Sequence, residues 1–508
     1  MAEAGKVRIA IVMRGSRGDV QPICVLAPAL VQAGYAVRLV TTSNLTELTR
    51  SFGIDTIGCC QDTEELVTNT KEYREAMATG DAESFGRAEV SEATMRGFRE
   101  ELPLIWEALD RFEPSLVMFN LLHERTVALY ALARCVPAMR VTFCPLALAT
   151  CTALPDGSLA AIPESFAAWW ACFEHGMVPS LWAQLEVAQE VLAWDFSGFR
   201  TALKDWCYDM SFGPLVGTCN VPPQICGYSG CFFPPASDWK CGIEVTGWWG
   251  VPRSPGVQCT PEPAGAFFWP GRRQALEEFM GAGEPPVCVG WGSMLAPSRE
   301  HMTALAVEAL RQAGVRGIIV SGWAKLSPEC LEAAPNAAEL RGYCSGSVLF
   351  VESAPHEWLF QRCACVVHHG GSGTTAASLG SGVPTIVTPF LADQPLAAKR
   401  VNSLNVGVGF DHITSVTAQQ LAAAIRKCCT DSVVRENARK FAEAIAAEPG
   451  AARAVAVIDS FVRDHLLTGN WLEIHRARFG VLPPGPPRPA CGETGDEGPP
   501  SWSMCGLL

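Results

Sequence analysis

The sequence is short of positive charge. Its 508 residues include 39 Lys and Arg against 52 Asp and Glu, which gives a net charge of −13. No long basic run offsets this balance, so the chain is a poor candidate for binding the phosphate backbone of a nucleic acid. Only 18% of the residues are charged and 48% are hydrophobic. This composition indicates a mostly globular chain. Its length corresponds to roughly two to four domains.

Two membrane-related patterns are also missing. The N-terminal residues 1–8 do not combine a charged start, an apolar stretch and a small-residue cleavage site, so they do not indicate a secretory signal. No window reaches about 18 consecutive apolar residues, so we expect no membrane-spanning helix. We therefore expect a cytoplasmic protein and leave peripheral contact with a membrane open. In a reducing compartment its 22 Cys are expected to be small buried thiols rather than disulfides.

Common phosphate and metal motifs are absent as well. The chain has no Gly-x-x-x-x-Gly-Lys-Ser/Thr loop and no Gly-x-Gly-x-x-Gly after its first apolar run, which argues against a P-loop hydrolase and a dinucleotide enzyme. Cys363, Cys365, His368 and His369 lie close together in the sequence, but a single residue between two thiols is not a zinc-binding spacing. We expect no metal there.

The chain does contain two stretches in which strands and helices alternate, and this pattern predicts an α/β fold. Because strand, crossover helix and strand follow one another, each stretch should form a parallel sheet, and the two sheets should face each other across a cleft. The predicted parts are an N-terminal domain over 1–250, a Pro-rich linker over 251–285, a C-terminal domain over 286–450, a helix over 451–468 that returns to the body, and a flexible Pro/Gly-rich tail over 469–508.

Tryptophan is concentrated in one region. Eight of the 15 Trp fall between about 150 and 250, namely Trp169, Trp170, Trp182, Trp194, Trp206, Trp239, Trp248 and Trp249. They can pack a long insertion, or they can form an aromatic wall for a large apolar ligand or a surface that meets a membrane. The sequence leaves both open.

The segment His-His-Gly-Gly-Ser-Gly-Thr-Thr, residues 368–375, lies between an apolar strand and a helical run expected over 376–379. Glycines let a backbone approach a ligand closely, and a helix start offers unpaired N–H groups at the positive end of its dipole. Ser372 and Thr374 can donate hydroxyl hydrogen bonds, and His369 can supply an N–H or a positive charge to a diphosphate. The alternative is a simple turn in which Ser or Thr caps the helix.

Three further polar residues are expected at the carboxyl ends of strands, where open α/β sheets bind ligands. Asp393 and Gln394 follow an apolar strand and suit neighbouring sugar hydroxyls, although Asp393 can equally cap the next helix. Asp19 ends the glycine loop after the first strand. It can act as a general base from the opposite side of the cleft, or it can be an ordinary acid at a helix N-terminus. His123 can assist acceptor binding or be structural.

Seven motifs in order resemble the sterol 3-β-glucosyltransferase branch of the UDP-glycosyltransferases, and also bacterial glycopeptide-antibiotic glycosyltransferases. The resemblance spans roughly residues 7–465 and is weaker over about 60–115 and 150–220. The motifs occupy residues 15–22, 227–229, 245–249, 292–294, 354–360, 368–375 and 382–395.

This resemblance implies a GT-B fold, which has two Rossmann-like domains facing a central cleft, and an inverting reaction that needs no metal and no cofactor. It implies Asp19 as the general base. The donor residues it implies are Ser16 and Arg17 in the first loop, Ala354 and His356 at the nucleoside, His369, Ser372, Gly373 and Thr374 at the diphosphate, and Asp393 and Gln394 at the sugar.

We therefore predict transfer of glucose from UDP-glucose, or a related nucleotide sugar, to the hydroxyl of a sterol or similar lipophilic acceptor. The acceptor can instead be a polyketide, a terpenoid or another specialised metabolite. From other classes, a sugar-nucleotide epimerase and a binding module without activity are the alternatives. Since Asp19 and His369 come from different domains, closure of the cleft would assemble the site.

Overall fold

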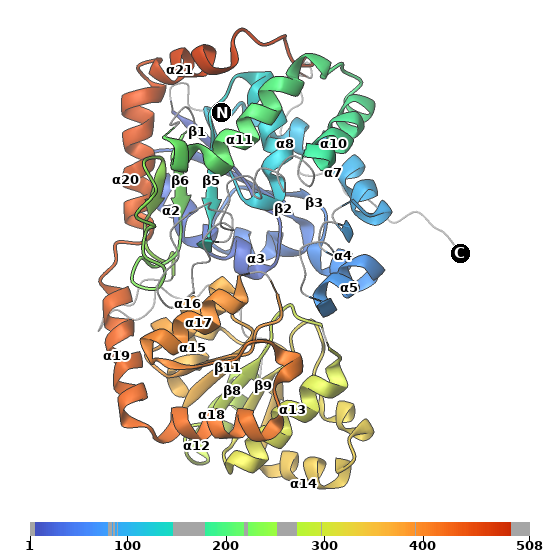
Figure 1. Cartoon of the computed structure of the whole chain (residues 1–508), viewed down its shortest axis with the longest axis vertical. Coiled ribbons are helices and arrows are strands. Elements are labelled where there is room, and N and C mark those ends of the chain that lie inside the picture. The colour runs from blue at the N-terminus through green and yellow to red at the C-terminus, as the bar shows by residue number, and fades with distance from the viewer. Residues whose placement is uncertain are drawn as a thin grey trace.

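The computed structural model describes residues 6–79, 84, 87–88, 90–145, 178–217, 222–250, 272–295, 297–391 and 393–488. Figure 1 shows two α/β halves stacked along the long axis, with the N-terminal half above the C-terminal half. Each half is built on a parallel sheet, which confirms the predicted fold class. In the part of the chain that the structure describes, no helix combines the length and apolar character that crossing a bilayer requires.

The N-terminal sheet has seven parallel strands in the order β3-β2-β1-β4-β5-β6-β7. Its central strands are short runs rich in Val and Ile that are buried on both faces, as parallel sheets covered by helices require. The bounds are β1 Arg8–Val12, β2 Ala36–Thr42, β3 Thr56–Cys60, β4 Leu116–Phe119, β5 Ala138–Thr142, β6 Gln224–Cys226 and β7 Ile243–Val245.

The C-terminal sheet has six parallel strands in the order β10-β9-β8-β11-β12-β13. In both sheets the order reverses beside the first strand of the half, so the loops after β1 and β8 lie where such sheets bind ligands. The bounds are β8 Val287–Gly290, β9 Gly317–Val320, β10 Val348–Val351, β11 Cys365–His368, β12 Thr385–Val387 and β13 Gly407–Gly409.

Helices cover both sheets. The helices of the N-terminal half are α1 Arg17–Val20, α2 Ile23–Gln32, α3 Thr46–Ser51, α4 Thr63–Asn69, α5 Lys71–Thr79, α7 Glu92–Phe112, α8 Glu124–Arg134, α10 Val178–Val191 and α11 Arg200–Val216. The later ones are α12 Arg272–Gly281, α13 Arg299–Ala313, α14 Ala337–Ser347, α15 His356–Leu359, α16 Ser372–Gly380, α17 Gln394–Leu404, α18 Ala418–Thr430, α19 Ser432–Ala446, α20 Ala451–Phe461 and α21 Asn470–Phe479.

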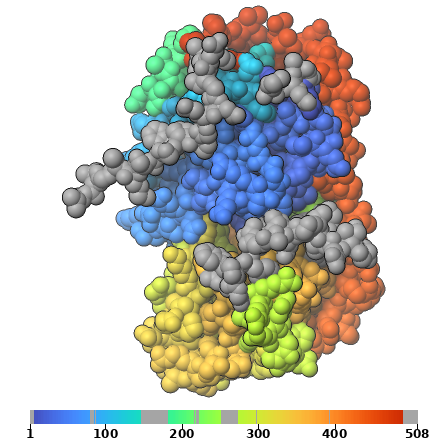
Figure 2. All heavy atoms as spheres, turned by 180° about the vertical axis from the view of Figure 1, so that it is seen from behind, coloured from blue at the N-terminus to red at the C-terminus, as the bar shows by residue number. Residues whose placement is uncertain are grey.

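The chain crosses back to the N-terminal half after α19. Helix α20 packs against α2, and its Val457, Ile458 and Phe461 are buried in the same apolar cluster as Leu26 and Leu30 of α2. Seen from behind, the red C-terminal segment runs along one side of both halves (Figure 2). The last part of the chain therefore fastens the two halves together along one edge.

The predicted linker and tail differ from the structure in part. Residues 251–271 of the predicted linker lie outside the described residues, and α12 occupies most of the remainder. Leu276 of α12 is fully buried among residues of the C-terminal sheet, so this helix belongs to that half.

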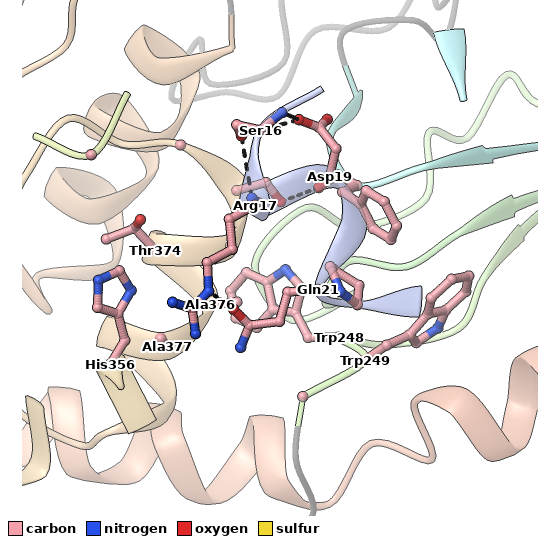
Figure 3. A pocket seen from close by; sticks show the side chains of 18 of the residues that line it. Ser16, Arg17, Asp19, Gln21, Trp248, Trp249, His356, Thr374, Ala376 and Ala377 are labelled. Atoms are coloured by element: carbon pink, nitrogen blue, oxygen red, sulfur yellow. Dashed lines mark hydrogen bonds between the residues drawn. The ribbon is translucent and has the colours of Figure 1, made fainter. Parts of the chain in front are cut away.

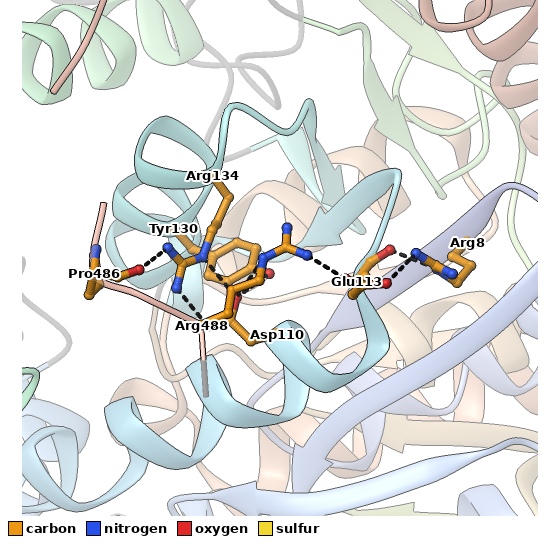
Figure 4. A network of polar contacts seen from close by, with 7 residues as sticks. All are labelled: Arg8, Asp110, Glu113, Tyr130, Arg134, Pro486 and Arg488. Carbon is orange, nitrogen blue, oxygen red and sulfur yellow. Dashed lines mark hydrogen bonds and ion pairs between the residues drawn. The ribbon is translucent and has the colours of Figure 1, made fainter. Parts of the chain in front are cut away.

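The prediction of a flexible tail from residue 469 is wrong for residues 470–488, whereas 489–508 lie outside the described residues. Helix α21 is followed by an extended segment that docks on the N-terminal half (Figure 4). Arg488 pairs with Glu113 at 2.7 Å, and Arg134 donates a hydrogen bond to the carbonyl oxygen of Pro486. A Pro-rich run has no periodicity that would reveal such contacts, because they depend on residues far away in the sequence.

Most described cysteines are the buried free thiols that the sequence predicts, among them Cys24, Cys207, Cys226 and Cys288. Cys241 is disulfide-bonded, which departs from that expectation. The described Trp residues serve mainly as packing. Trp206 and Trp249 are buried, and Trp182, Trp194, Trp239 and Trp248 lie against apolar clusters, while Trp169 and Trp170 lie outside the described residues.

Candidate active site

One cavity of about 1740 Å³ separates the two halves, and both contribute to its wall. It lies at the carboxyl ends of the strands in both sheets, as expected for doubly wound α/β folds. All the catalytic and donor-binding residues implied by the sequence line it. Figure 3 shows Ser16, Arg17 and Asp19 approaching from the N-terminal half, and His356 and Thr374 from the C-terminal half. The structure thus brings the predicted residues together, and their individual roles stay predictions.

Asp19 is held by the loop that follows β1. Its Oδ2 accepts hydrogen bonds from the backbone N of Ser16 at 2.8 Å and from Ser16 Oγ at 3.1 Å. Ser16 Oγ in turn accepts from Gly18 N at 3.2 Å, so Ser16 and Asp19 form a capping box on α1. Gly15 has a φ of +136°, and a Cβ there would lie 2.3 Å from Asp19 Oδ2, so only glycine fits. Asp19 is therefore both a helix N-terminal acid and a cleft residue.

The environment of Asp19 favours a proton acceptor. Burial raises the pKa of its carboxyl, and the hydrogen bonds from Ser16 oppose that shift. A carboxylate that is partly desolvated binds a proton more readily than one in water. The position of Asp19 in the cavity wall and the upward shift of its pKa both suit a general base.

Arg17 brings positive charge to the cleft. Its Nε donates to Gln21 Oε1 at 2.8 Å, and Gln21 Nε2 donates to Glu357 Oε1 at 3.3 Å in the C-terminal half. Burial lowers the pKa of Arg17, and the charge of Glu357 raises it again. Gln21 and Glu357 are site residues that we did not single out from the sequence, although they lie within the motifs at 15–22 and 354–360.

Helix α16 begins at Ser372, four residues before the helical run expected from the sequence. Its N-cap is Gly371 and no side chain caps it, so the alternative of a capping Ser or Thr does not apply. The N–H groups of the first turn, at Ser372, Gly373 and Thr374, have no acceptor within the helix and stand at its positive end. Helix α16 has nine residues, and its start lines the cavity.

The start of α16 also contacts the opposite half. Ser372 Oγ donates to the carbonyl oxygen of Phe143, and a Cβ on Gly373 would lie 3.4 Å from the Cα of Gly18. The N-terminal end of α16 therefore faces the loop that carries Asp19. In this arrangement the Ser372 hydroxyl holds the two halves together.

The two adjacent histidines have different surroundings. His368 is fully buried, with Nε2 2.8 Å from Thr385 Oγ1, while its Nδ1 accepts from Gly370 N at 3.0 Å. It is a structural residue. His369 lies in the cavity wall between two glycines, because a Cβ on Gly371 would lie 2.3 Å from its Nε2 and one on Gly292 would lie 3.0 Å from its Cε1.

His369 is also neutral. Burial and the neighbouring His356 lower its pKa to about 4, and its Nδ1 is buried without a hydrogen-bond partner. Of the two possibilities left open by the sequence, a neutral ring can offer an N–H at neutral pH and not a positive charge. His356 resembles it, because burial and the charge of Arg17 lower its pKa to about 3. The His356 ring stacks on Phe360 with centroids 4.5 Å apart, and Ala354 lies buried just before it.

Asp393 and Gln394 begin α17. Asp393 is the N-cap residue, but its side chain makes no capping hydrogen bond. Burial and the Asp19 carboxylate across the cleft together raise its pKa to about 6, and hydrogen bonds from its own backbone N–H and from Cys144 partly oppose the shift. Gln394 Oε1 accepts from Phe390 N at 2.8 Å and Leu391 N at 3.1 Å, so its amide oxygen is used to hold the preceding loop.

Trp248 and Trp249, which the sequence leaves open as part of an aromatic wall, line the cavity and lie within the motif at 245–249. Sequence reasoning missed Cys144, which lines the cavity as well. Cys144 belongs to no motif, and its position just after β5 is the only signal that it has. His123 is buried and does not line the cavity, so the structure does not support a role in acceptor binding.

Comparisons with known proteins agree with this architecture. The C-terminal domain of the erythromycin biosynthesis protein CIII-like family matches residues 330–460. The chain is 27% identical over 460 residues to a sterol 3-beta-glucosyltransferase of Pichia angusta, covering 89% of this chain and 33% of that protein. It is 27% identical over 467 residues to a sterol 3-beta-glucosyltransferase of Arabidopsis thaliana, covering 90% and 68%. The chain spans about a third of the length of the first of these relatives.

Among solved structures, the glycotransferase of kitacinnamycin superposes with a TM-score of 0.59 at 18% identity, covering 89% of this chain and 98% of that one. The two facing parallel-sheet halves and their cleft therefore define a GT-B fold, that of glycosyltransferases. Over most of its length the chain is similar to sterol 3-β-glucosyltransferases, in agreement with the resemblance carried by its seven motifs.

Proposed function

We propose that this protein transfers glucose from UDP-glucose to the hydroxyl group of a sterol or similar lipophilic acceptor, with inversion and without a metal ion. One observation carries the proposal. A carboxylate with a raised pKa and a helix N-terminus that no side chain caps lie on opposite walls of one cavity. A displacement with inversion needs its base and its leaving-group stabiliser on opposite sides of the reacting carbon.

The residues suggest the following steps. The acceptor hydroxyl gives its proton to Asp19 while its oxygen attacks the anomeric carbon. The bond from that carbon to the diphosphate oxygen breaks, its electron pair leaves with UDP, and a glycosidic bond forms on the opposite face. The N–H groups at the start of α16, the neutral His369 and the cation of Arg17 would stabilise the charge that develops on the diphosphate.

The part of the cavity near Asp19 supports an apolar acceptor. Trp248, Trp249, Phe143, Val25 and Pro28 line it together with polar groups of the loop after β1. A sterol ring system offers an extended apolar surface and one hydroxyl, which suits a wall of this kind. A different specialised metabolite is the second candidate, because the match over residues 330–460 is to an antibiotic-biosynthesis domain.

The decisive experiment is an acceptor panel with mass-spectrometric detection. The protein is incubated with UDP-glucose and, separately, sterols, polyketides and terpenoids. We expect sterol glucosides whose anomeric configuration is opposite to that of the donor. If only polyketides or terpenoids are glucosylated, the acceptor is one of these compounds and not a sterol. Conversion of the nucleotide sugar with no acceptor present would favour an epimerase instead.

The same assay tests the donor and the metal. Replacing UDP-glucose by TDP-glucose shows which nucleobase of the donor the protein accepts. Turnover should be the same with and without added magnesium or manganese. A strict requirement for either ion would remove the metal-free part of the proposal.

A further inference from the structure

A second group of polar side chains lies at the carboxyl edge of the N-terminal sheet, outside the cavity wall. Cys60 is the last residue of β3, Glu101 is on α7, and His123 ends the short turn Leu121–His123 that follows β4. One ligand atom from each of the three lies within 4.8 Å of the others. Their exposed fractions are 4%, 2% and 1%. Three residues that are far apart in the sequence therefore converge on one point away from solvent.

His123 is unsatisfied in this cluster. Neither Nδ1 nor Nε2 has a hydrogen-bond partner, although the whole ring is buried. Buried polar atoms nearly always have a partner, so an imidazole with both nitrogens unpaired indicates a missing ligand. A metal ion binds an imidazole at a ring nitrogen that carries no proton, and either unpaired nitrogen of His123 can take that role.

Glu101 is oriented by the surrounding backbone. Its Oε2 accepts from Gln61 N at 2.6 Å, and its Oε1 lies 3.5 Å from Arg14 NH1. Each carboxylate oxygen can accept more than one interaction, so these two contacts do not exclude a bond to a metal ion. Contacts of this kind fix the direction of metal-binding carboxylates in known sites.

Cys60 supplies the third donor. Cys60 is buried with the other two donors. A divalent ion displaces the thiol proton to solvent as the sulfur–metal bond forms. The thiolate and the carboxylate then offset two of the three positive charges that the ion and Arg14 bring together.

We propose that Cys60, Glu101 and His123 bind a structural zinc ion that ties β3, α7 and the loop after β4 together. One sulfur, one oxygen and one imidazole nitrogen form a donor set that suits zinc, and calcium and magnesium prefer oxygen alone. A water molecule would complete the tetrahedron. None of the three ligands lines the cleft, so the ion would not touch the substrates. It would instead support Asn120, a cleft residue whose Nδ2 donates to Arg14 O at 2.6 Å.

The test measures zinc in the full-length protein, expressed with zinc and purified without a metal-affinity column. Wild-type protein should hold stoichiometric zinc by plasma mass spectrometry after dialysis. Cys60→Ser and His123→Gln should each lose it. The matched control is Cys207→Ser, a buried free thiol in the same half that belongs to no three-residue ligand cluster among the described residues. This control should keep the wild-type zinc content.

X-ray absorption at the zinc edge of the wild-type protein provides a test that does not depend on the folding of the variants. We expect one sulfur and otherwise nitrogen and oxygen neighbours. Wild-type protein without zinc, a sulfur-free or all-sulfur shell, or equal zinc content in folded Cys60→Ser and wild type would each overturn the proposal. Thermal unfolding should also occur at a higher temperature with zinc than with a chelator in wild type, and at the same temperature in folded His123→Gln.

Discussion

The two walls of the cleft handle charge in different ways. The N-terminal wall presents charged side chains, with Asp19 and Arg17 on one loop, beside the apolar surfaces of Trp248 and Trp249. The C-terminal wall presents backbone N–H groups at the start of α16 and a neutral His369, and it also carries the charged residues Lys325, Glu357 and Asp393. In a chain with a net charge of −13, an anionic donor must be bound against the overall field of the protein. We therefore expect the proposed diphosphate to be held by oriented dipoles together with the local cations of the wall, Arg17 and Lys325 among the described residues.

The largest effect is expected on the N-terminal wall. Asp19→Asn keeps an oxygen that can accept the hydrogen bonds from Ser16 but cannot take a proton from the acceptor. Turnover should fall by about 10²–10⁴, with donor affinity nearly unchanged. Steady-state kinetics and calorimetric titration with UDP measure the two quantities. Asp431→Asn, which replaces the N-cap of α19 by another good capping residue, is the control and should behave as wild type. Wild-type turnover in Asp19→Asn would remove Asp19 as the base.

On the C-terminal wall, replacing His369 should weaken the binding of UDP. His369→Ala removes the N–H that we assign to the diphosphate, and hydrogen bonds to charged groups contribute about 1.5–3 kcal/mol. UDP should therefore bind about 10–100-fold more weakly. The comparison variant is His368→Ala, which breaks the contacts with Thr385 and Gly370 and should mainly lower the unfolding temperature. If the two variants bind UDP equally well, the separation of their roles is lost.

Glycine substitutions give a finer comparison within the same half. A Cβ on Gly371 would lie 2.3 Å from His369 Nε2, so Gly371→Ala must displace that ring, and we expect roughly tenfold weaker UDP binding. Gly342 lies in α14 with nothing within 4 Å of an added Cβ. Gly342→Ala should keep wild-type binding and raise stability by up to about 1 kcal/mol, because alanine favours a helix. Titration with UDP and chemical denaturation test both variants.

The smallest effect concerns the two carboxylates that face each other across the cleft. The pKa of Asp393 is about 6 in the folded protein, and an unperturbed Asp has about 3.9. The folded state thus holds this proton more tightly, so wild-type stability falls as the pH rises from about 4 to about 6. Asparagine cannot ionise and escapes that loss.

Asp393→Asn should therefore unfold a few degrees above wild type near pH 7 and at the wild-type temperature near pH 4. Scanning calorimetry at both values checks this. A difference that is the same at both pH values would show that ionisation of Asp393 is not its cause.

Part of the difference between the two walls of the cleft could be predicted from local patterns in the sequence. The Gly-rich loop after β1 and the segment from His368 to Thr375 carry their residue types in the sequence, and both line the cavity. The start of α16 was placed too late, since Gly371 caps it without a side-chain signal. The apolar runs of the sequence do not reveal strands β3, β6, β7 and β13, because these strands are short and lack a clear apolar alternation. No local pattern distinguishes His368 from His369.

The sequence by itself determined the α/β class, the two halves and the residue types at the cleft, because periodicity and glycine spacing are local properties of the chain. Only the tertiary structure decided which histidine reaches the cavity, that Asp393 is influenced by Asp19, and that the segment up to Arg488 docks on the N-terminal half. It also brought Cys60, Glu101 and His123 to one buried point. Burial and the field of distant charges set these properties, and both arise from residues that meet only after the chain has folded.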